Sequence, residues 1–199
     1  KIKKRPKITE DTIIAFVFGQ SNAANYGGEK FIAETQNVYN YFNQIFYKAE
    51  DPLLGSSGEK GSVWTLTANK LIKEKITDQV ILIPAAIGNT SVADWKKSGR
   101  LNYMFESKLK EAKANNLLIT HFLWHQGEAD NPNGNNPQLG LTNYEKGMKE
   151  IILMTKKYFP RSKFIIAIAS RCTLKVSASI PLQIIQKNLT NMKGVYLGP

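Results

Sequence analysis

Five apolar runs, each rich in β-branched or aromatic residues, recur along the chain at wide intervals. They show little strict alternation of apolar and polar positions, which is typical of parallel strands covered on both faces. We therefore expect buried strands at residues 12–18, 79–85, 117–124, 163–170 and 194–198. A shorter run at 37–42 indicates one more strand at an edge of the sheet.

Helical periodicity fills most of the intervals between these runs, with apolar residues three and four positions apart. The third helical segment is predicted to begin at Thr142, because Glu145 three residues later would complete a capping box. The fourth is predicted to begin after Ser179 as N-cap, with Pro181 in its first turn. The expected helices cover residues 64–75, 105–116, 141–159 and 179–191.

The alternation of strands and helices predicts an α/β fold made of βαβ units. We expect a three-layer α/β/α domain with a flavodoxin-like, doubly wound sheet of about five parallel strands, spanning residues 11–199. A chain of 199 residues, 42% of them hydrophobic, suits one such core. Three of the four long polar loops directly follow a strand, and ligands bind at that end of such sheets.

The net charge of +11 raises the question of a nucleic-acid partner. Five positive charges lie in residues 1–7, and the remaining 22 basic residues are interspersed with 16 acidic ones. This distribution favours a solubilising surface with a basic N-terminal tail at residues 1–10, and we expect no nucleic-acid partner. No apolar run approaches the roughly 18 residues of a membrane span. The compartment stays open between the cytoplasm and secretion after removal of a leader.

The single cysteine, Cys172, cannot form a disulfide within the chain. It follows the fourth predicted strand, in the segment Ser170-Arg171-Cys172. We interpret Cys172 as a small, semi-buried residue and not as a thiol nucleophile. Arg171 beside it is a candidate for contact with an anionic substrate at the rim of the site.

The first strand ends abruptly at Gly19, where Gln20, Ser21 and Asn22 follow. One interpretation is that Ser21 and Asn22 cap a following helix. The other is that Ser21 is a nucleophile, because α/β hydrolases place theirs at a strand-to-helix turn. The small residues that follow would leave space around the hydroxyl, although the second glycine of G-x-S-x-G is missing.

Two further loops carry chemically useful groups. Residues 123–130, with the sequence LWHQGEAD, end the third strand in a dense group of polar side chains. His121 and His125 would lie on one face of either a helix or a strand. Two histidines without further ligands do not favour a metal site, however, and we expect none. After the second strand, Gly88 offers a backbone N–H, or simply forms a turn before a capped helix.

Taken together, G-Q-S-N, G-x-T-S-x-x-D-W and W-H-Q-G-E-A-D, in this order, resemble the SGNH hydrolase superfamily. More narrowly, they are similar to the sialate O-acetylesterase domain group, which includes carbohydrate esterase family six. The resemblance runs from about Ala15 to Pro199. It implies the SGNH hydrolase fold and a serine esterase that removes O-acetyl groups, expected on a small-molecule or glycan ester, through an acyl-enzyme and without a cofactor.

The resemblance also implies roles for individual residues. Ser21 would be the nucleophile, and the N–H groups of Ser21 and Gly88 with the side-chain amide of Gln126 would form the oxyanion hole. Glu128 would either orient the catalytic base or hold its own loop. The residues expected to contact the substrate are Gln20, Asn22, Asn89, Thr90, His125 and Arg171.

The base is where the sequence departs from the family pattern, which places a histidine in a D-x-x-H motif near the C-terminus. Neither His121 nor His125 follows an aspartate by three residues, and both precede residue 126. We expect the chain to continue past Pro199 with this motif. The alternatives are a degenerate member that binds carbohydrate without catalysis, and an O-acetyltransferase on the same scaffold.

Overall fold

The computed structural model describes residues 2, 4–131, 137–170 and 179–199, and these form one α/β domain around a seven-stranded sheet. The strand order is β3-β2-β4-β1-β5-β6-β7, and all neighbours are parallel except β2 and β3. The strands are β1 (Thr12–Gly19), β2 (Val38–Phe42), β3 (Ile45–Lys48), β4 (Gln79–Pro84), β5 (His121–His125), β6 (Lys163–Ile166) and β7 (Val195–Leu197).

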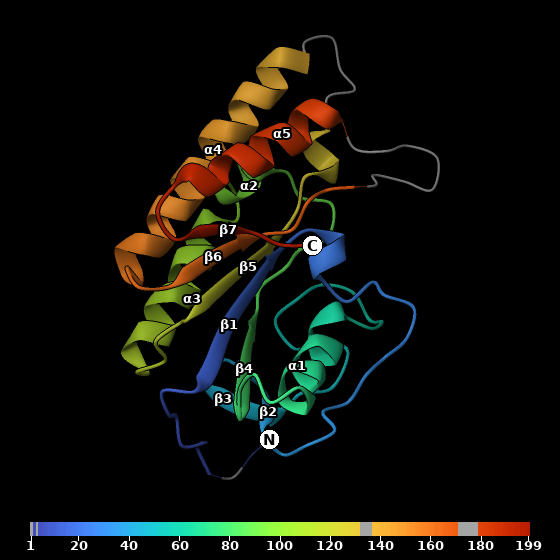
Figure 1. Cartoon of the computed structure of the whole chain (residues 1–199), viewed down its shortest axis with the longest axis vertical. Coiled ribbons are helices and arrows are strands. Elements are labelled where there is room, and N and C mark those ends of the chain that lie inside the picture. Colours follow the sequence, from blue (N-terminus) through green and yellow to red (C-terminus); the bar gives the residue numbers. More distant parts are fainter. Residues whose placement is uncertain (1, 3, 132–136, 171–178) are drawn as a thin grey trace.

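Helices cover both faces of the sheet, with α1 alone on one side and the other α-helices on the opposite side (Figure 1). The α-helices are α1 (Val63–Lys73), α2 (Val92–Trp95), α3 (Asn102–Ala114), α4 (Pro137–Tyr158) and α5 (Ile180–Asn188). Short 3₁₀ helices are η1 (Ser21–Ala23), η2 (Glu128–Asp130) and η3 (Leu189–Asn191). The three-layer, doubly wound architecture predicted from the sequence is confirmed.

The five predicted parallel strands lie in the order β4-β1-β5-β6-β7, which is the flavodoxin-like order 2-1-3-4-5. After β1 the chain forms β2, β3 and β4, which all lie on one side of β1. It then crosses to β5 on the other side. The strand order therefore reverses at β1, and a crevice between diverging loops is expected beyond its carboxyl end. Ser21 lies at this carboxyl end of the strands, directly after β1.

Two features of the sheet differ from the sequence prediction. The edge run expected at 37–42 continues into a second strand, β3, through a two-residue turn at Asn43 and Gln44 with φ angles of 47° and 63°. Both residues at positive φ are typical of a tight hairpin, but Asn-Gln lacks the glycine that usually signals one. The runs predicted at 117–124 and 163–170 also form shorter strands, because only residues 121–125 and 163–166 pair in regular ladders.

The predicted start of the third helix at Thr142 is wrong, because α4 begins at Pro137. Proline suits the first turn of a helix, where its missing N–H is not needed. The capping-box spacing of Thr142 and Glu145 therefore falls inside the helix. The other helix start is confirmed, since Ser179 accepts a hydrogen bond from Leu182 N–H at 3.3 Å and Pro181 lies in the first turn.

The larger core lies between the sheet and helices α3, α4 and α5. Phe18 is its centre, in ring contact with Trp95, Phe105, Phe122 and Trp124 at centroid distances of 4.8 to 6.2 Å. All five are essentially inaccessible to solvent. This packing fixes the ends of β1 and β5, the two strands from which the polar loops of the site depart.

On the α1 side, the sheet is less completely covered. Leu123 of β5 and Ile165 of β6 are only partly buried there, and with α1 they line an apolar groove of about 280 Å³. Within the described residues, no helix is long and apolar enough to cross a membrane. The segment predicted as a basic tail contacts the domain: Ile2 N–H donates to Phe46 O at 2.7 Å, and Arg5 donates to Asn115 O at 2.5 Å.

Candidate active site

Ser21 lies just beyond the carboxyl end of β1, at a point where β1 and β5 approach each other closely. Gly19 has a φ of +129°, and a Cβ on it would lie 2.2 Å from the carbonyl oxygen of His125. Only glycine fits this approach without strain. The next residue, Gln20, donates its N–H to the same His125 oxygen at 3.0 Å, so the turn before Ser21 is anchored to β5.

Ser21 is the first residue of η1 and is partly exposed. The N-cap of η1 is Gln20, whose side chain makes no capping hydrogen bond. Asn22 does not act as a cap either, since its side-chain amide donates to Glu128 of the neighbouring loop. The capping interpretation of Ser21 and Asn22 therefore does not describe this turn.

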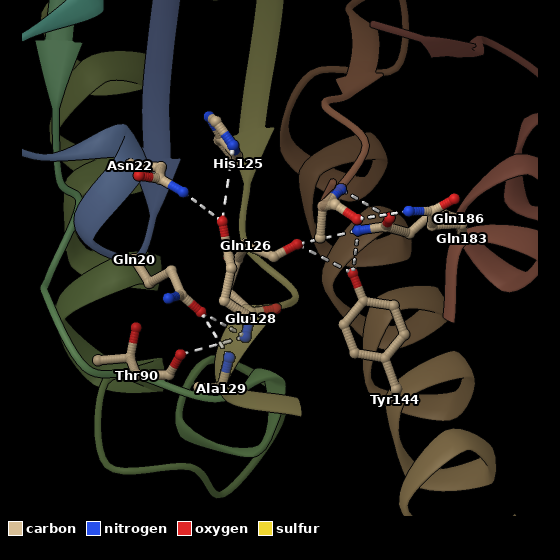
Figure 2. A network of polar contacts seen from close by, with 11 residues as sticks. Gln20, Asn22, Thr90, His125, Gln126, Glu128, Ala129, Tyr144, Gln183 and Gln186 are labelled. Atoms are coloured by element: carbon tan, nitrogen blue, oxygen red, sulfur yellow. Dashed lines mark hydrogen bonds and ion pairs between the residues drawn. The ribbon is translucent and has the colours of Figure 1, made fainter. Parts of the chain in front are cut away.

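Glu128 is the buried acid of the site (Figure 2). Its side chain is 6% exposed, its Oε1 accepts the Asn22 amide, and His125 Nε2 lies 3.8 Å from the same oxygen. Among the described residues, no hydrogen-bond partner reaches its other oxygen, Oε2, which is also buried. Burial lowers the pKa of His125, against the opposing effect of the Glu128 carboxylate.

Gln126 occupies the interior, behind the surface of the site. Its side chain is fully buried, and its amide nitrogen lies at 3.2 Å from Gln20 Oε1, 3.1 Å from Thr90 O and 2.5 Å from Asp130 Oδ2. The amide thus faces three acceptors from three loops. To bond an oxyanion, as the sequence analysis predicts, it would have to exchange one of these acceptors.

The backbone of Gln126 is held by a second set of buried polar groups (Figure 2). Its carbonyl oxygen accepts from Tyr144 Oη at 3.3 Å and from Gln186 Nε2 at 3.0 Å. Gln186 also accepts the Ala169 N–H at 3.0 Å, and Gln183 donates to the Ala169 carbonyl at the same distance. Helices α4 and α5 are therefore bonded directly to the loop after β5.

Asp130 links this loop to the one after β4. Its Oδ2 accepts the Val92 N–H at 2.8 Å, at the start of α2, as well as the Gln126 amide. Burial raises the pKa of Asp130, although both hydrogen bonds act in the opposite direction. Asp130 stands in the HQGEAD motif, but the sequence alone does not show that it joins the two loops.

Gly88 is aligned with the end of β1, because the preceding Ile87 donates its N–H to Gly19 O at 3.1 Å. The N–H of Gly88 donates to Ser57 Oγ at 2.7 Å, and Ser56 Oγ accepts the Ala86 N–H at 3.0 Å. An oxyanion at Gly88 would take the place of Ser57 as acceptor. Sequence reasoning missed both serines, whose signal is the G-S-S-G run at 55–58 in a polar loop.

The predicted substrate-contacting residues divide by burial. Asn22 and Asn89 are exposed, His125 keeps a quarter of its side chain exposed, and Gln20 and Thr90 are buried among protein groups. Thr90 donates to Ile87 O at 2.9 Å and accepts from Trp95 Nε1 at 3.1 Å, so its hydroxyl serves the loop.

Two predicted residues fall elsewhere. Arg171 and Cys172 lie outside the described residues. Within the described part of the chain, no group of three or more histidine, cysteine, aspartate or glutamate side chains is arranged to hold a metal ion.

This arrangement, with a serine after the first strand of a doubly wound sheet and the loops after β4 and β5 beside it, defines an SGNH hydrolase fold. A family model described as "Carbohydrate esterase, sialic acid-specific acetylesterase" matches residues 12–194. The chain belongs to this family of carbohydrate esterases. No curated protein matches the chain.

Solved structures are similar over nearly the whole chain. A protein from Arabidopsis thaliana matches with a TM-score of 0.76 and 17% identity, covering 94% of this chain and 84% of its own. NanS matches with a TM-score of 0.67 and 14% identity, covering 96% and 78%. A carbohydrate acetylesterase from Xanthomonas citri matches with a TM-score of 0.57 and 12% identity, covering 94% of this chain and 49% of that protein. At these identities the likeness concerns the fold.

Proposed function

We propose that this protein is a serine O-acetylesterase that removes acetyl groups from a carbohydrate through an acyl-enzyme intermediate. The observation that carries the proposal is the buried Glu128 carboxyl group, which accepts a hydrogen bond from Asn22, the residue directly after the partly exposed Ser21. A carboxylate is costly to bury without full hydrogen bonding. A buried acid held by the residue after Ser21 suits a catalytic role better than a purely structural one.

In the proposed reaction, the Ser21 hydroxyl attacks the acetyl carbonyl as a base takes its proton. The tetrahedral intermediate collapses, the sugar hydroxyl leaves with a proton, and Ser21 is acetylated. Water then attacks the acetyl-serine, releasing acetate and restoring the hydroxyl. Every step is proton transfer and acyl transfer, so the proposed reaction uses no cofactor.

Negative charge on the carbonyl oxygen would be stabilised by the N–H groups of Ser21 and Gly88 and by the amide of Gln126. Support for this assignment is the shared location of the three groups at the carboxyl ends of β1, β4 and β5. Ser57 and Asp130 hold Gly88 and Gln126 before substrate arrives. Losing one oxyanion donor costs on the order of 100- to 1000-fold in rate.

The base is proposed to be a histidine in the D-x-x-H motif that the family resemblance implies. Neither His121 nor His125 stands in such a motif. The site supports a histidine base because Oε2 of Glu128, which no donor among the described residues reaches, offers an acceptor for an imidazole N–H.

The proposed class of substrate, an O-acetylated carbohydrate, rests on the family and on the names of similar proteins. The family model is described as sialic acid-specific acetylesterase, and the Xanthomonas citri protein is described as a carbohydrate acetylesterase. The fold by itself does not choose a substrate. Which sugar carries the acetyl group is therefore a matter for the assay.

The test is hydrolysis of p-nitrophenyl acetate and of an O-acetylated sugar by the full-length protein. We expect acetate release from both esters, abolished by Ser21→Ala and unchanged by Ser107→Ala, a control at an exposed serine of α3. Failure of Ser21→Ala to abolish hydrolysis would overturn the proposal. Transfer of acetate to added sugar in place of water would identify a transferase.

A further inference from the structure

Tyr26 is an exposed aromatic side chain beside the candidate active site that the proposed reaction does not use. It lies three residues after η1 and is 49% exposed, whereas Trp95, Trp124 and Tyr144 are buried in the larger core. A single exposed aromatic residue is common on protein surfaces. Tyr26 differs because hydrogen bonds hold the backbone on both sides of it and its ring packs against a defined surface.

The ring of Tyr26 packs against two glycines, Gly88 and Gly58. A Cβ on Gly88 would lie 2.9 Å from both Cε2 and Oη of Tyr26, and a Cβ on Gly58 would lie 3.1 Å from the same Cε2. The phenol end of the ring therefore lies directly against the backbone of Gly88, the predicted oxyanion donor. Any larger residue at Gly88 would push the ring away.

The backbone around Tyr26 is held by buried hydrogen bonds. Asn25 is 1% exposed; its side chain donates to Leu53 O at 3.0 Å and to Ser56 O at 3.2 Å, and accepts from Leu53 N–H at 2.9 Å. On the other side, Gly27 N–H donates to Gly61 O at 2.8 Å. A ring ordered in advance loses little conformational entropy when a ligand binds.

We propose that the pyranose ring of the acetylated carbohydrate stacks on the exposed face of Tyr26. This proposal rests on the proposed esterase function. The ring offers apolar area at small entropic cost, and its hydroxyl donates a hydrogen bond to Ser57 Oγ at 3.4 Å, which helps to fix the ring. Because the Tyr26 ring lies against Gly88, a sugar stacked on it would lie next to the proposed oxyanion donor. No heavy atom lies within 4 Å of a Cβ built at Gly28, so the chain leaves open space two residues further on.

The kinetic test compares Tyr26→Ala and Tyr26→Phe on glucose pentaacetate and p-nitrophenyl acetate, with the full-length protein. Loss of stacking predicts that Tyr26→Ala raises KM for the sugar ester about threefold to tenfold. The loss in kcat/KM should be smaller for p-nitrophenyl acetate than for the sugar ester, since p-nitrophenyl acetate has no pyranose ring. Tyr26→Phe should resemble the wild type on both. Tyr103→Ala is the matched control, at a tyrosine that is 84% exposed on α3.

An equal loss on both esters, or no loss on either, would overturn the stacking proposal. So would a Tyr26→Phe variant as impaired as Tyr26→Ala, because the hydroxyl would then be the active group. A binding measurement separates this from failure of the esterase function: calorimetric titration of glucose pentaacetate into Ser21→Ala, with and without Tyr26→Ala. Weaker binding in the double variant supports stacking whether or not the wild type hydrolyses esters, and equal binding contradicts it.

Discussion

The side-chain amide of Asn22 donates to Glu128 Oε1, so the residue next to Ser21 holds the buried carboxylate of the neighbouring loop. This bond leaves Oε2 of Glu128 for another donor. In a serine hydrolase, an acid in such a place keeps the base in its working tautomer and orientation. We therefore propose two separable tasks for Glu128, one through each oxygen.

Glu128→Gln should separate these tasks, because the amide keeps the size of the side chain and removes its charge. We expect kcat for p-nitrophenyl acetate to fall on the order of 100- to 10,000-fold, as when a triad acid becomes an amide. The measurement is steady-state kinetics with the full-length protein. Glu145→Gln on α4, 45% exposed, is the control that should change nothing. Undiminished kcat in Glu128→Gln would leave Glu128 with the loop-holding role alone.

Gly19→Ala should destabilise the fold, because a Cβ there would lie 2.2 Å from His125 O at a φ of +129°. Backbone must move to relieve such a contact, and we expect a loss of about 2–4 kcal/mol in the free energy of unfolding. Urea denaturation followed by circular dichroism measures it. Gly28→Ala, with open space around it, should cost less than about 1 kcal/mol. Equal losses at the two glycines would refute the close approach.

Gln186→Met tests the buried polar network behind the site. The substitution keeps the volume of the side chain but removes the acceptor for Ala169 N–H and the donor to Gln126 O. An unpaired buried polar group costs about 1–3 kcal/mol, so we expect a loss in that range or slightly above it. Gln183→Met is the control, since Gln183 is only partly buried and makes one bond to Ala169. A loss no larger than the control's would count against the network.

The arrangement of the sheet could be predicted from the sequence because apolar runs and helical periodicity report burial directly. The hairpin of β2 and β3 could not, since the turn at Asn43 and Gln44 takes positive φ angles without glycine. The start of α4 was misplaced for a related reason. A capping-box spacing at Thr142 is a local signal, whereas the helix extends back to Pro137.

Within the site, the sequence identified which loops meet but not which side chains face solvent. Gln126 and Thr90 belong to motifs that suggest ligand contact, yet both are 0% exposed. Their burial depends on packing against α2 and α4, which no local pattern encodes. Ser57 was missed because its loop follows β3, a strand that the sequence analysis did not predict; only the fold brings Ser57 against Gly88.

The two histidines should make the fold less stable as the pH falls from about 7 to about 5. Burial lowers the pKa of both His121 and His125, with Lys163 adding to the effect at His121 and Glu128 opposing it at His125. The unfolded chain then binds more protons than the folded chain, so stability is complete above the unfolded pKa of about 6.5 and is lost as the pH falls toward the folded values. The raised pKa of Asp130 acts in the opposite sense, but it is common to the wild type and to the double variant His121→Asn/His125→Asn. Urea denaturation at pH 5, 6 and 7 should therefore show a weaker pH dependence in the double variant, and an identical dependence would mean that neither imidazole is kept neutral by burial.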